Sequence, residues 1–191
     1  MTDHDTIDLL TLLDSRFVHF SRRAALRREH DPGAIELSYA DLRERVTARA
    51  RVLETMGAGN GARVALLCEN RPAWVISFLA ALHAGAVVVP LDTKLGTGEI
   101  AALLGHARPR LILASHAHAA RAHEVAARLA HAVPVVSIEG DDSHDGGDIS
   151  EVISRSSANP CVSLARDPDE AALVIYTSGT TGEPKGVTIT F

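Results

Sequence analysis

The stretch from residue 177 to residue 186 gathers the side chains that are best suited to hold a polyphosphate. Hydroxyl residues alternate with glycines there, and a lysine follows them. Hydroxyls and backbone N–H groups that converge at glycines donate hydrogen bonds to anionic oxygens, and a lysine adds a compact positive charge. The candidate phosphate-binding residues are Thr177, Ser178, Gly179, Thr180, Thr181, Gly182 and Lys185.

Two features of this loop set it apart from other phosphate-binding patterns. Lys185 stands three residues after Gly182, which differs from the Walker spacing G-x-x-x-x-G-K-[ST]. The β-branched run 187–191 predicts a strand after the loop, so no helix N-terminus would face the anion. Lys94 is the only other lysine, and the remaining basic residues are arginines, which draws attention to Lys185. The alternative interpretation is a Ser/Thr/Gly surface loop without a ligand.

Apolar runs alternate with amphipathic segments in the part of the chain that must position this loop. We expect strands over 34–39, 63–68, 86–91, 110–114, 133–138 and 171–176, and helices over 7–29, 38–56, 72–85, 97–106 and 116–131. This alternation is typical of an α/β fold with a doubly wound, mostly parallel sheet and flanking helices. The loop would then lie beyond the carboxyl end of a strand, where open α/β sheets bind ligands.

The domain organisation follows from the polar segments near the end of the chain. The loop 140–148 cannot pack into a core. A helix is expected over 149–156, and a polar linker follows it up to residue 169. We assign residues 1–168 to one α/β portion of a domain. Residues 169–191 form a strand, the phosphate-binding loop and a second strand, which start the next subdomain.

Composition excludes several other classes of protein. The net charge is -5 without a concentrated basic face, which argues against a nucleic-acid partner. The polar N-terminus does not resemble a signal peptide, and no apolar stretch reaches the roughly 20 residues of a transmembrane helix. Cys68 and Cys161 have no metal or redox spacing, so we expect a cytoplasmic, reduced protein.

Two further groups of charged side chains are weaker candidates. One expected helix carries His116, His118, His123 and His131, but no cysteine or carboxylate cluster completes a metal site, and we assign no metal ligand. The arginines near residues 22–28 are interpreted as a solvated face, with a partner-docking site as the second interpretation.

Residues 175–186 resemble the signature of the adenylate-forming, or AMP-binding, enzyme superfamily, which includes acyl-CoA synthetases, luciferases and the adenylation domains of peptide synthetases. Segments 37–42 and 82–92 resemble two earlier motifs of this family in order and spacing, and we give both a structural role. The resemblance covers residues 35–191 and implies the N-terminal portion of the family's large domain.

The resemblance implies a two-step reaction. A carboxylate attacks the α-phosphate of ATP to give an acyl-adenylate and pyrophosphate, and a CoA thiol then attacks the adenylate. The loop residues named above would hold the β- and γ-phosphates, with Mg²⁺ sharing their charge. No residue of the chain is assigned a catalytic role.

Residues 93–100 favour the acyl-CoA synthetase branch, because amino-acid-activating domains usually continue with a Pro-x-Tyr-Pro-like stretch and an arginine here. We therefore predict an ATP-dependent acid–thiol ligase of fatty acid metabolism that uses ATP, Mg²⁺ and CoA. The alternatives are an adenylation domain that loads a carrier protein, a non-catalytic nucleotide-binding fragment, and one half of a split protein with a complementing C-terminal polypeptide.

The resemblance places the adenine, ribose, acyl and CoA segments, and a C-terminal lid domain with its catalytic lysine, outside these 191 residues. We therefore expect weak or no ligase turnover by the isolated chain. Phe191 stands where the family often has histidine, so the role of that side chain in the acyl pocket is not carried over.

Overall fold

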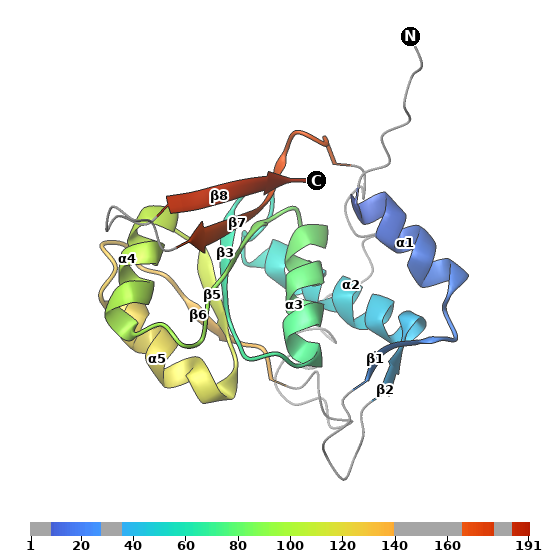
Figure 1. Ribbon diagram of the computed structural model, residues 1–191, viewed down its shortest axis with the longest axis horizontal. Coiled ribbons are helices and arrows are strands. Elements are labelled where there is room, and N and C mark those ends of the chain that lie inside the picture. Colours follow the sequence, from blue (N-terminus) through green and yellow to red (C-terminus); the bar gives the residue numbers. More distant parts are fainter. Residues whose placement is uncertain (1–8, 28–35, 140–165, 178–184) are drawn as a thin grey trace.

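The computed structural model describes residues 9–27, 36–139, 166–177 and 185–191. Its strands are β1 (Ala24–Arg27), β2 (Glu36–Ser38), β3 (Arg63–Leu67), β4 (Val87–Pro90), β5 (Leu111–Ala114), β6 (Val135–Ser137), β7 (Ala171–Thr177) and β8 (Lys185–Thr190). Its helices are α1 (Leu9–His19), α2 (Tyr39–Thr55), α3 (Pro72–His83), α4 (Thr97–Ala107) and α5 (His116–Ala127) (Figure 1).

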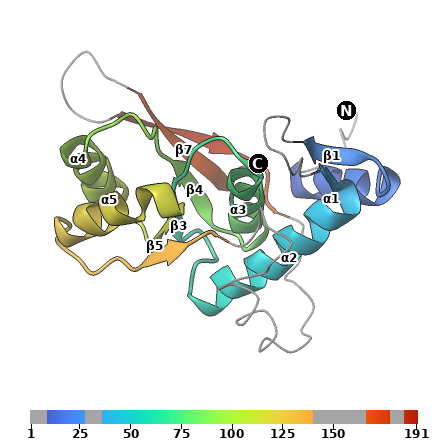
Figure 2. The same cartoon turned by 90° about the horizontal axis from the view of Figure 1, so that it is seen from below.

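A six-stranded sheet with the order β6-β5-β3-β4-β7-β8 forms the centre of the molecule. All of its neighbouring strands run parallel except the last pair, β7 and β8. Helices α2 and α3 lie on one side of this sheet, and α4 and α5 lie on the other (Figure 2). The expected α/β fold with a doubly wound, mostly parallel sheet and flanking helices is confirmed.

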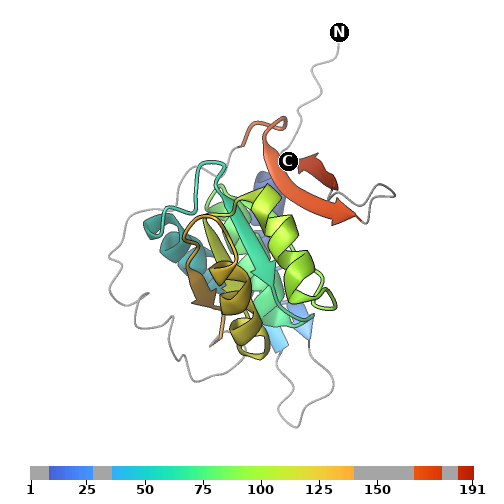
Figure 3. The same ribbon diagram turned by 90° about the vertical axis from the view of Figure 1, so that its left-hand side faces the viewer.

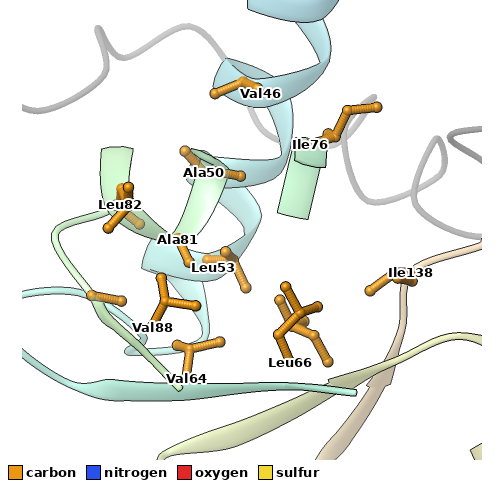
Figure 4. Packing of buried hydrophobic residues seen from close by; sticks show 14 of the residues in the cluster. Val46, Ala50, Leu53, Val64, Leu66, Ile76, Ala81, Leu82, Val88 and Ile138 are labelled. Carbon is orange, nitrogen blue, oxygen red and sulfur yellow. The ribbon is translucent and has the colours of Figure 1, made fainter. Parts of the chain in front are cut away.

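Each inner strand supplies apolar side chains to both faces of the sheet, because successive residues point in opposite directions. In β3, Val64 and Leu66 pack toward α2 and α3, whereas Ala65 and Leu67 pack toward α4 and α5. Figure 4 shows the first of these cores, in which Leu53 of α2 and Leu82 of α3 meet the strand residues. Burying a leucine of this kind contributes about 1.5–3 kcal/mol, so the two cores account for much of the fold's stability.

Helix α2 begins with a capping box formed by Ser38 and Asp41. The backbone N–H of Asp41 donates to Ser38 Oγ over 3.1 Å, and the backbone N–H of Ser38 donates to Asp41 Oδ2 over 2.9 Å. These two bonds satisfy donors that a helix start leaves without a helical partner. Pro72 stands in the first turn of α3, where its missing N–H costs nothing.

The expectation of a helix over 7–29 was wrong in its second half. Helix α1 ends at His19, and Ala24–Arg27 form β1, which pairs antiparallel with β2. The backbone N–H of Tyr39 donates to Arg23 O over 3.0 Å, and Arg27 forms an ion pair with Glu36 over 3.2 Å. These contacts with a distant segment outweigh the local helical pattern. Helix α5 likewise ends earlier than expected, at Ala127, and the helix expected over 149–156 lies outside the described residues.

Strands β7 and β8 form an antiparallel hairpin at one end of the sheet, which confirms both expected strands. The hairpin is attached through one parallel register pair, Val88 of β4 with Leu173 of β7, and β7 then diverges from β4. Figure 3 shows the hairpin projecting from the body of the molecule. All residues of β8 are exposed. The division of the domain at residue 168 stays a prediction.

Candidate functional site

The candidate phosphate-binding loop joins the two strands of the β7–β8 hairpin. Thr177, the last residue of β7, is the register partner of Lys185, the first residue of β8. The hairpin therefore brings these two predicted site residues together at its loop end, and Lys185 is exposed. The other predicted site residues, Ser178, Gly179, Thr180, Thr181 and Gly182, lie outside the described residues.

Gly186 allows the two strands to meet closely just beside Lys185. A Cβ atom at this position would lie 2.8 Å from Val174 Cγ1 and 3.3 Å from Tyr176 Cε1. A carbon–carbon approach of 2.8 Å is too short for any larger residue without a shift of the strand. The glycine that follows the lysine in the sequence motif therefore has a packing role in the hairpin.

Tyr176 connects the loop end of the hairpin to helix α4. Its phenolic oxygen lies 2.7 Å from His106 Nδ1, and the two rings meet edge to face with their centroids 5.7 Å apart. Burial raises the pKa of the Tyr176 phenol, so the phenol is protonated at neutral pH and shares a hydrogen bond with the imidazole nitrogen. Neither residue was predicted to be part of the site, because nothing in the spacing of a helix and a strand 70 residues apart links them.

Strand β7 ends directly before the candidate loop, so the loop follows the carboxyl end of a strand as expected. The contact with His106 places the end of β7 beside the last turn of α4, and α4 itself ends next to the start of β3, where Arg63 Nη1 donates to Ala107 O over 2.9 Å. The last residues of β7 therefore turn away from the direction of β3 and β5. The reason is the divergence of β7 after its single register pair with β4, which adds to the normal twist between strands.

A basic cavity of about 670 Å³ lies beside the inner side of the hairpin. Val174 and Thr188 of the hairpin contribute to its wall. Its charged lining residues are Arg63, Arg108, Arg166 and Glu170, so positive charge is in excess. Such an excess raises the local concentration of anions near the hairpin.

The carboxyl ends of β3, β5 and β6 carry a different set of charged groups, and these groups bind one another. Arg71 pairs with Glu69 over 3.1 Å and with Glu139 over 3.0 Å, while Ser115 Oγ donates to Glu69 Oε2 over 2.6 Å. Burial alone would raise the pKa of Glu69, but the bonds from Ser115, from its own backbone N–H and from Arg71 lower that pKa to about 2. We interpret this network as a structural tie between the strand ends.

The histidines in the described part of the chain do not gather with other groups that bind metals. Within that part, no three His, Cys, Asp or Glu side chains are grouped so that they could hold a metal ion, and the assignment of no metal ligand stays a prediction. His118 lies 3.6 Å from Glu69 and 3.0 Å from an Arg121 nitrogen, and His131 Nε2 lies 3.4 Å from Pro109 O. The histidines of this region therefore make separate local contacts.

Among the described helices, none has the length and apolar character needed to cross a membrane.

Comparison with known proteins connects this geometry to a family. Residues 14–191 match the family described as AMP-binding enzyme. The chain is 34% identical to fumosorinone synthetase of Cordyceps fumosorosea over 178 residues, which is 93% of this chain and 4% of that protein. It is 30% identical to crotonobetaine/carnitine–CoA ligase of Salmonella paratyphi A over 177 residues, which is 90% of this chain and 34% of the ligase. The chain thus spans only a small part of the length of these relatives.

Solved structures give the same result. The N-terminal domain of FACL13 from Mycobacterium tuberculosis superposes with a TM-score of 0.74 at 26% identity, covering 95% of this chain and 44% of that one. The N-terminal subdomain of NpsA from Klebsiella oxytoca superposes with a TM-score of 0.71 at 26% identity, covering 95% of this chain and 41% of that one. With the family match extending over nearly the whole sequence, the chain belongs to the AMP-binding enzyme family and forms an N-terminal portion of its adenylate-forming domain.

Proposed function

We propose that this chain supplies the residues that bind the phosphates of ATP, here called the phosphate grip. The complete protein is a cytoplasmic, ATP-dependent acid–thiol ligase of the acyl-CoA synthetase type. The observation that carries this proposal is the register pair Thr177–Lys185, which places the lysine at the mouth of the hairpin loop within a family match. Thr177, Lys185 and the loop residues between them bind the β- and γ-phosphates. The basic cavity beside the hairpin favours the approach of the anionic nucleotide.

In the proposed reaction, a carboxylate oxygen of the acid attacks the α-phosphorus of ATP. The bond from this phosphorus to the bridging oxygen breaks, and pyrophosphate leaves with the acyl-adenylate as the other product. Lys185 stabilises the charge that develops on the leaving pyrophosphate, and the loop hydroxyls keep it in line. When bound with the nucleotide, Mg²⁺ would share that charge, and the loop hydroxyls are oxygen ligands of the kind that it accepts.

The proposed acid is a fatty acid and the proposed thiol acceptor is CoA. The resemblance of residues 93–100 to acyl-CoA synthetases and the similarity to crotonobetaine/carnitine–CoA ligase support this choice. In the second step the thiol sulfur attacks the carbonyl carbon of the adenylate, and AMP leaves. A protein that joins this chain to the adenine, ribose, acyl and CoA segments and the lid domain should form acyl-CoA from ATP, a fatty acid and CoA. Mass spectrometry detects the product.

A second candidate is an adenylation domain that loads a carrier protein. The similarity to the hybrid PKS-NRPS synthetase iccA of Talaromyces variabilis, 36% identical over 151 residues, favours it. The same assay separates the two candidates when a phosphopantetheinylated carrier protein replaces CoA. An acyl-carrier product without acyl-CoA would select this second function.

The phosphate grip itself is tested by the affinity of the chain for Mg-ATP. We expect saturable binding in isothermal titration calorimetry and a loss of about tenfold or more in Lys185→Ala, because a charged hydrogen bond to phosphate contributes about 1.5–3 kcal/mol. Lys94→Ala is a matched control, since Lys94 is exposed and is the other lysine of the chain. Equal affinity in the wild type and Lys185→Ala would refute the assignment of Lys185.

A further inference from the structure

We propose that Tyr176 and His106 are positioning residues for the phosphate grip. Their contact clamps the loop end of the β7–β8 hairpin onto α4 and fixes the place of Lys185. This inference rests on the proposed function of the loop. The clamp is defined as the Tyr176 phenol, the His106 imidazole and Gly186 across the hairpin from Tyr176.

The clamp lies between the loop and the part of β7 that packs in the core, where Ala172 and Val174 are buried. In the described part of the chain, β8 pairs with β7 alone, and β7 shares one register pair with β4, at Leu173. The side chains of Ile175 and Val187 on the outer face are 38% and 51% exposed. The hydrogen bond of 2.7 Å between Tyr176 and His106 therefore anchors the hairpin close to its loop.

The clamp also specifies the register of the two strands. Tyr176 is paired with Gly186, and a Cβ atom at residue 186 would lie 2.8 Å from Val174 Cγ1 and 3.3 Å from the Tyr176 ring. A slip of one residue would bring Lys185 or Val187 opposite the ring, and both have side chains that cannot fit there. Because side chains alternate between faces, the same slip would also turn Lys185 to the opposite face of the hairpin.

The clamp is separated from the phosphate contacts by the hairpin itself. Tyr176 lies on the same face as Val174, packed toward the α4 side, whereas Lys185 follows the alternation of Val187 on the other face. Tyr176 and His106 can therefore set the position of Lys185 without touching the group that Lys185 binds. For this reason we assign them a positioning role and not a catalytic one.

The first test measures amide hydrogen exchange of the hairpin. Tyr176→Phe removes only the hydroxyl group, and His106→Ala removes its hydrogen-bond partner. We expect both variants to lose protection over residues 173–177 and 185–189, with unchanged protection in β3 and β4. His106→Asn should restore the protection, because the Asn side chain carries both an acceptor and a donor near the position of Nδ1. His123→Ala is the control, since His123 is an exposed histidine of α5.

The second test measures the affinity for Mg-ATP in the same variants. Tyr176→Phe and His106→Ala should each weaken binding about three- to tenfold, the usual range for losing one hydrogen bond. The double variant should be no weaker than either single one, because both remove the same contact.

The outcomes separate this inference from the proposed function. If the wild type does not bind Mg-ATP, the proposed function fails, and hydrogen exchange still decides whether the clamp exists. Unchanged exchange in both single variants would overturn the clamp, whatever happens to the affinity. Additive losses of affinity in the double variant would overturn it as well, since the two residues would then act separately.

Discussion

At Gly85, the absence of a side chain allows a left-handed backbone and a close approach of the Arg166 side chain. Gly85 has φ +79°, a left-handed conformation that side chains rarely adopt, and a Cβ there would lie 1.8 Å from Arg166 Nη2. The backbone carbonyl of Gly85 also accepts from the N–H of Gly61 over 2.7 Å. Gly85, which follows α3, thus leaves room for the side chain of Arg166, which precedes β7.

We expect Gly85→Ala to lower the free energy of unfolding by about 1–3 kcal/mol, because the strained backbone and the displaced guanidinium both destabilise the folded state. Urea unfolding followed by circular dichroism measures this change. Gly105→Ala is the matched control: Gly105 lies within α4 and a Cβ there meets nothing within 4 Å. The control should be neutral or stabilising by up to about 1 kcal/mol, as in other helix interiors. Equal effects at both positions would contradict this account.

Glu69 makes stability depend on acidity. Its pKa is lowered to about 2 from an ordinary value of 4.5, so the folded state prefers the ionised carboxylate. The stabilisation is fully present above pH 4.5 and is lost as the pH falls toward 2. We expect Glu69→Gln to destabilise the protein by about 1–2 kcal/mol at pH 7, a figure that allows for solvent screening of a partly exposed group.

The difference between the wild type and Glu69→Gln should shrink as the pH falls below 4.5 in thermal unfolding experiments. Glu124→Gln serves as the comparison, because Glu124 forms an exposed helical ion pair with Arg128 and its removal should cost little. A constant difference between wild type and Glu69→Gln across the acid range would mean that the carboxylate charge does not stabilise the network.

Among single residues, those in local patterns could be interpreted from the sequence and those in long-range contacts could not. The short spacing around Lys185 predicts a phosphate-binding loop, a role that stays a prediction, and the spacing of Ser38 and Asp41 is that of a helix N-cap. Tyr176 and His106 meet only because the twist of β7 brings them together, and such a contact depends on the packed fold. The packing role of Gly186 could have been inferred from its place opposite an aromatic residue in a hairpin, had the strand register been known.

At the scale of the elements, the start of α2 offers a quantitative test of a sequence motif. The hydrogen bonds from the Ser38 hydroxyl and backbone to Asp41 also lower the pKa of that carboxyl. Ser38→Ala should reduce the free energy of unfolding by about 1 kcal/mol, and Ser38→Asn should restore most of it, because Asn is an equally good N-cap. Chemical denaturation checks both changes. An Ala variant as stable as the wild type would show that the cap is not limiting for α2.

Elements were predicted best where their residues are buried on both sides. Strands β3, β4 and β5 have continuous apolar runs, and their bounds differ from the expected ones by a residue or so. Residues 24–27 were misread, because this short apolar segment continues the helical spacing of α1 but gains ladder bonds from β2. The direction of β7 could not be predicted either, since strand alternation gives no information on how far a terminal strand turns.

At the scale of the whole molecule, the hairpin leaves an apolar surface uncovered by the described residues. Ile175, Val187 and Ile189 are 38%, 51% and 41% exposed and share one face of the hairpin, and β8 is an edge strand. Edges of this kind promote pairing between chains. We expect concentration-dependent self-association of the chain in sedimentation velocity experiments, reduced by Val187→Lys.

Val18→Lys is the control for this experiment, because Val18 of α1 is also exposed, at 59%, but does not lie on a strand edge. The lysine at position 187 adds charge to the edge and should shift the distribution toward the monomer, whereas the one at position 18 should not. Self-association that responds equally to both changes would point to general hydrophobicity and not to the hairpin.

The attachment of β7 at one register pair has a consequence for the order of folding. Strands β3 to β6 are joined by single helices, so their contacts close short stretches of chain. β7 must return to β4 from Leu173 to Val88, which costs more chain entropy and yields one ladder position in exchange. We therefore expect substitutions in β3 and β4 to slow refolding, and substitutions in the hairpin to act chiefly on the unfolding rate. The segment that we propose to bind the nucleotide would then be the last part of the chain to fold.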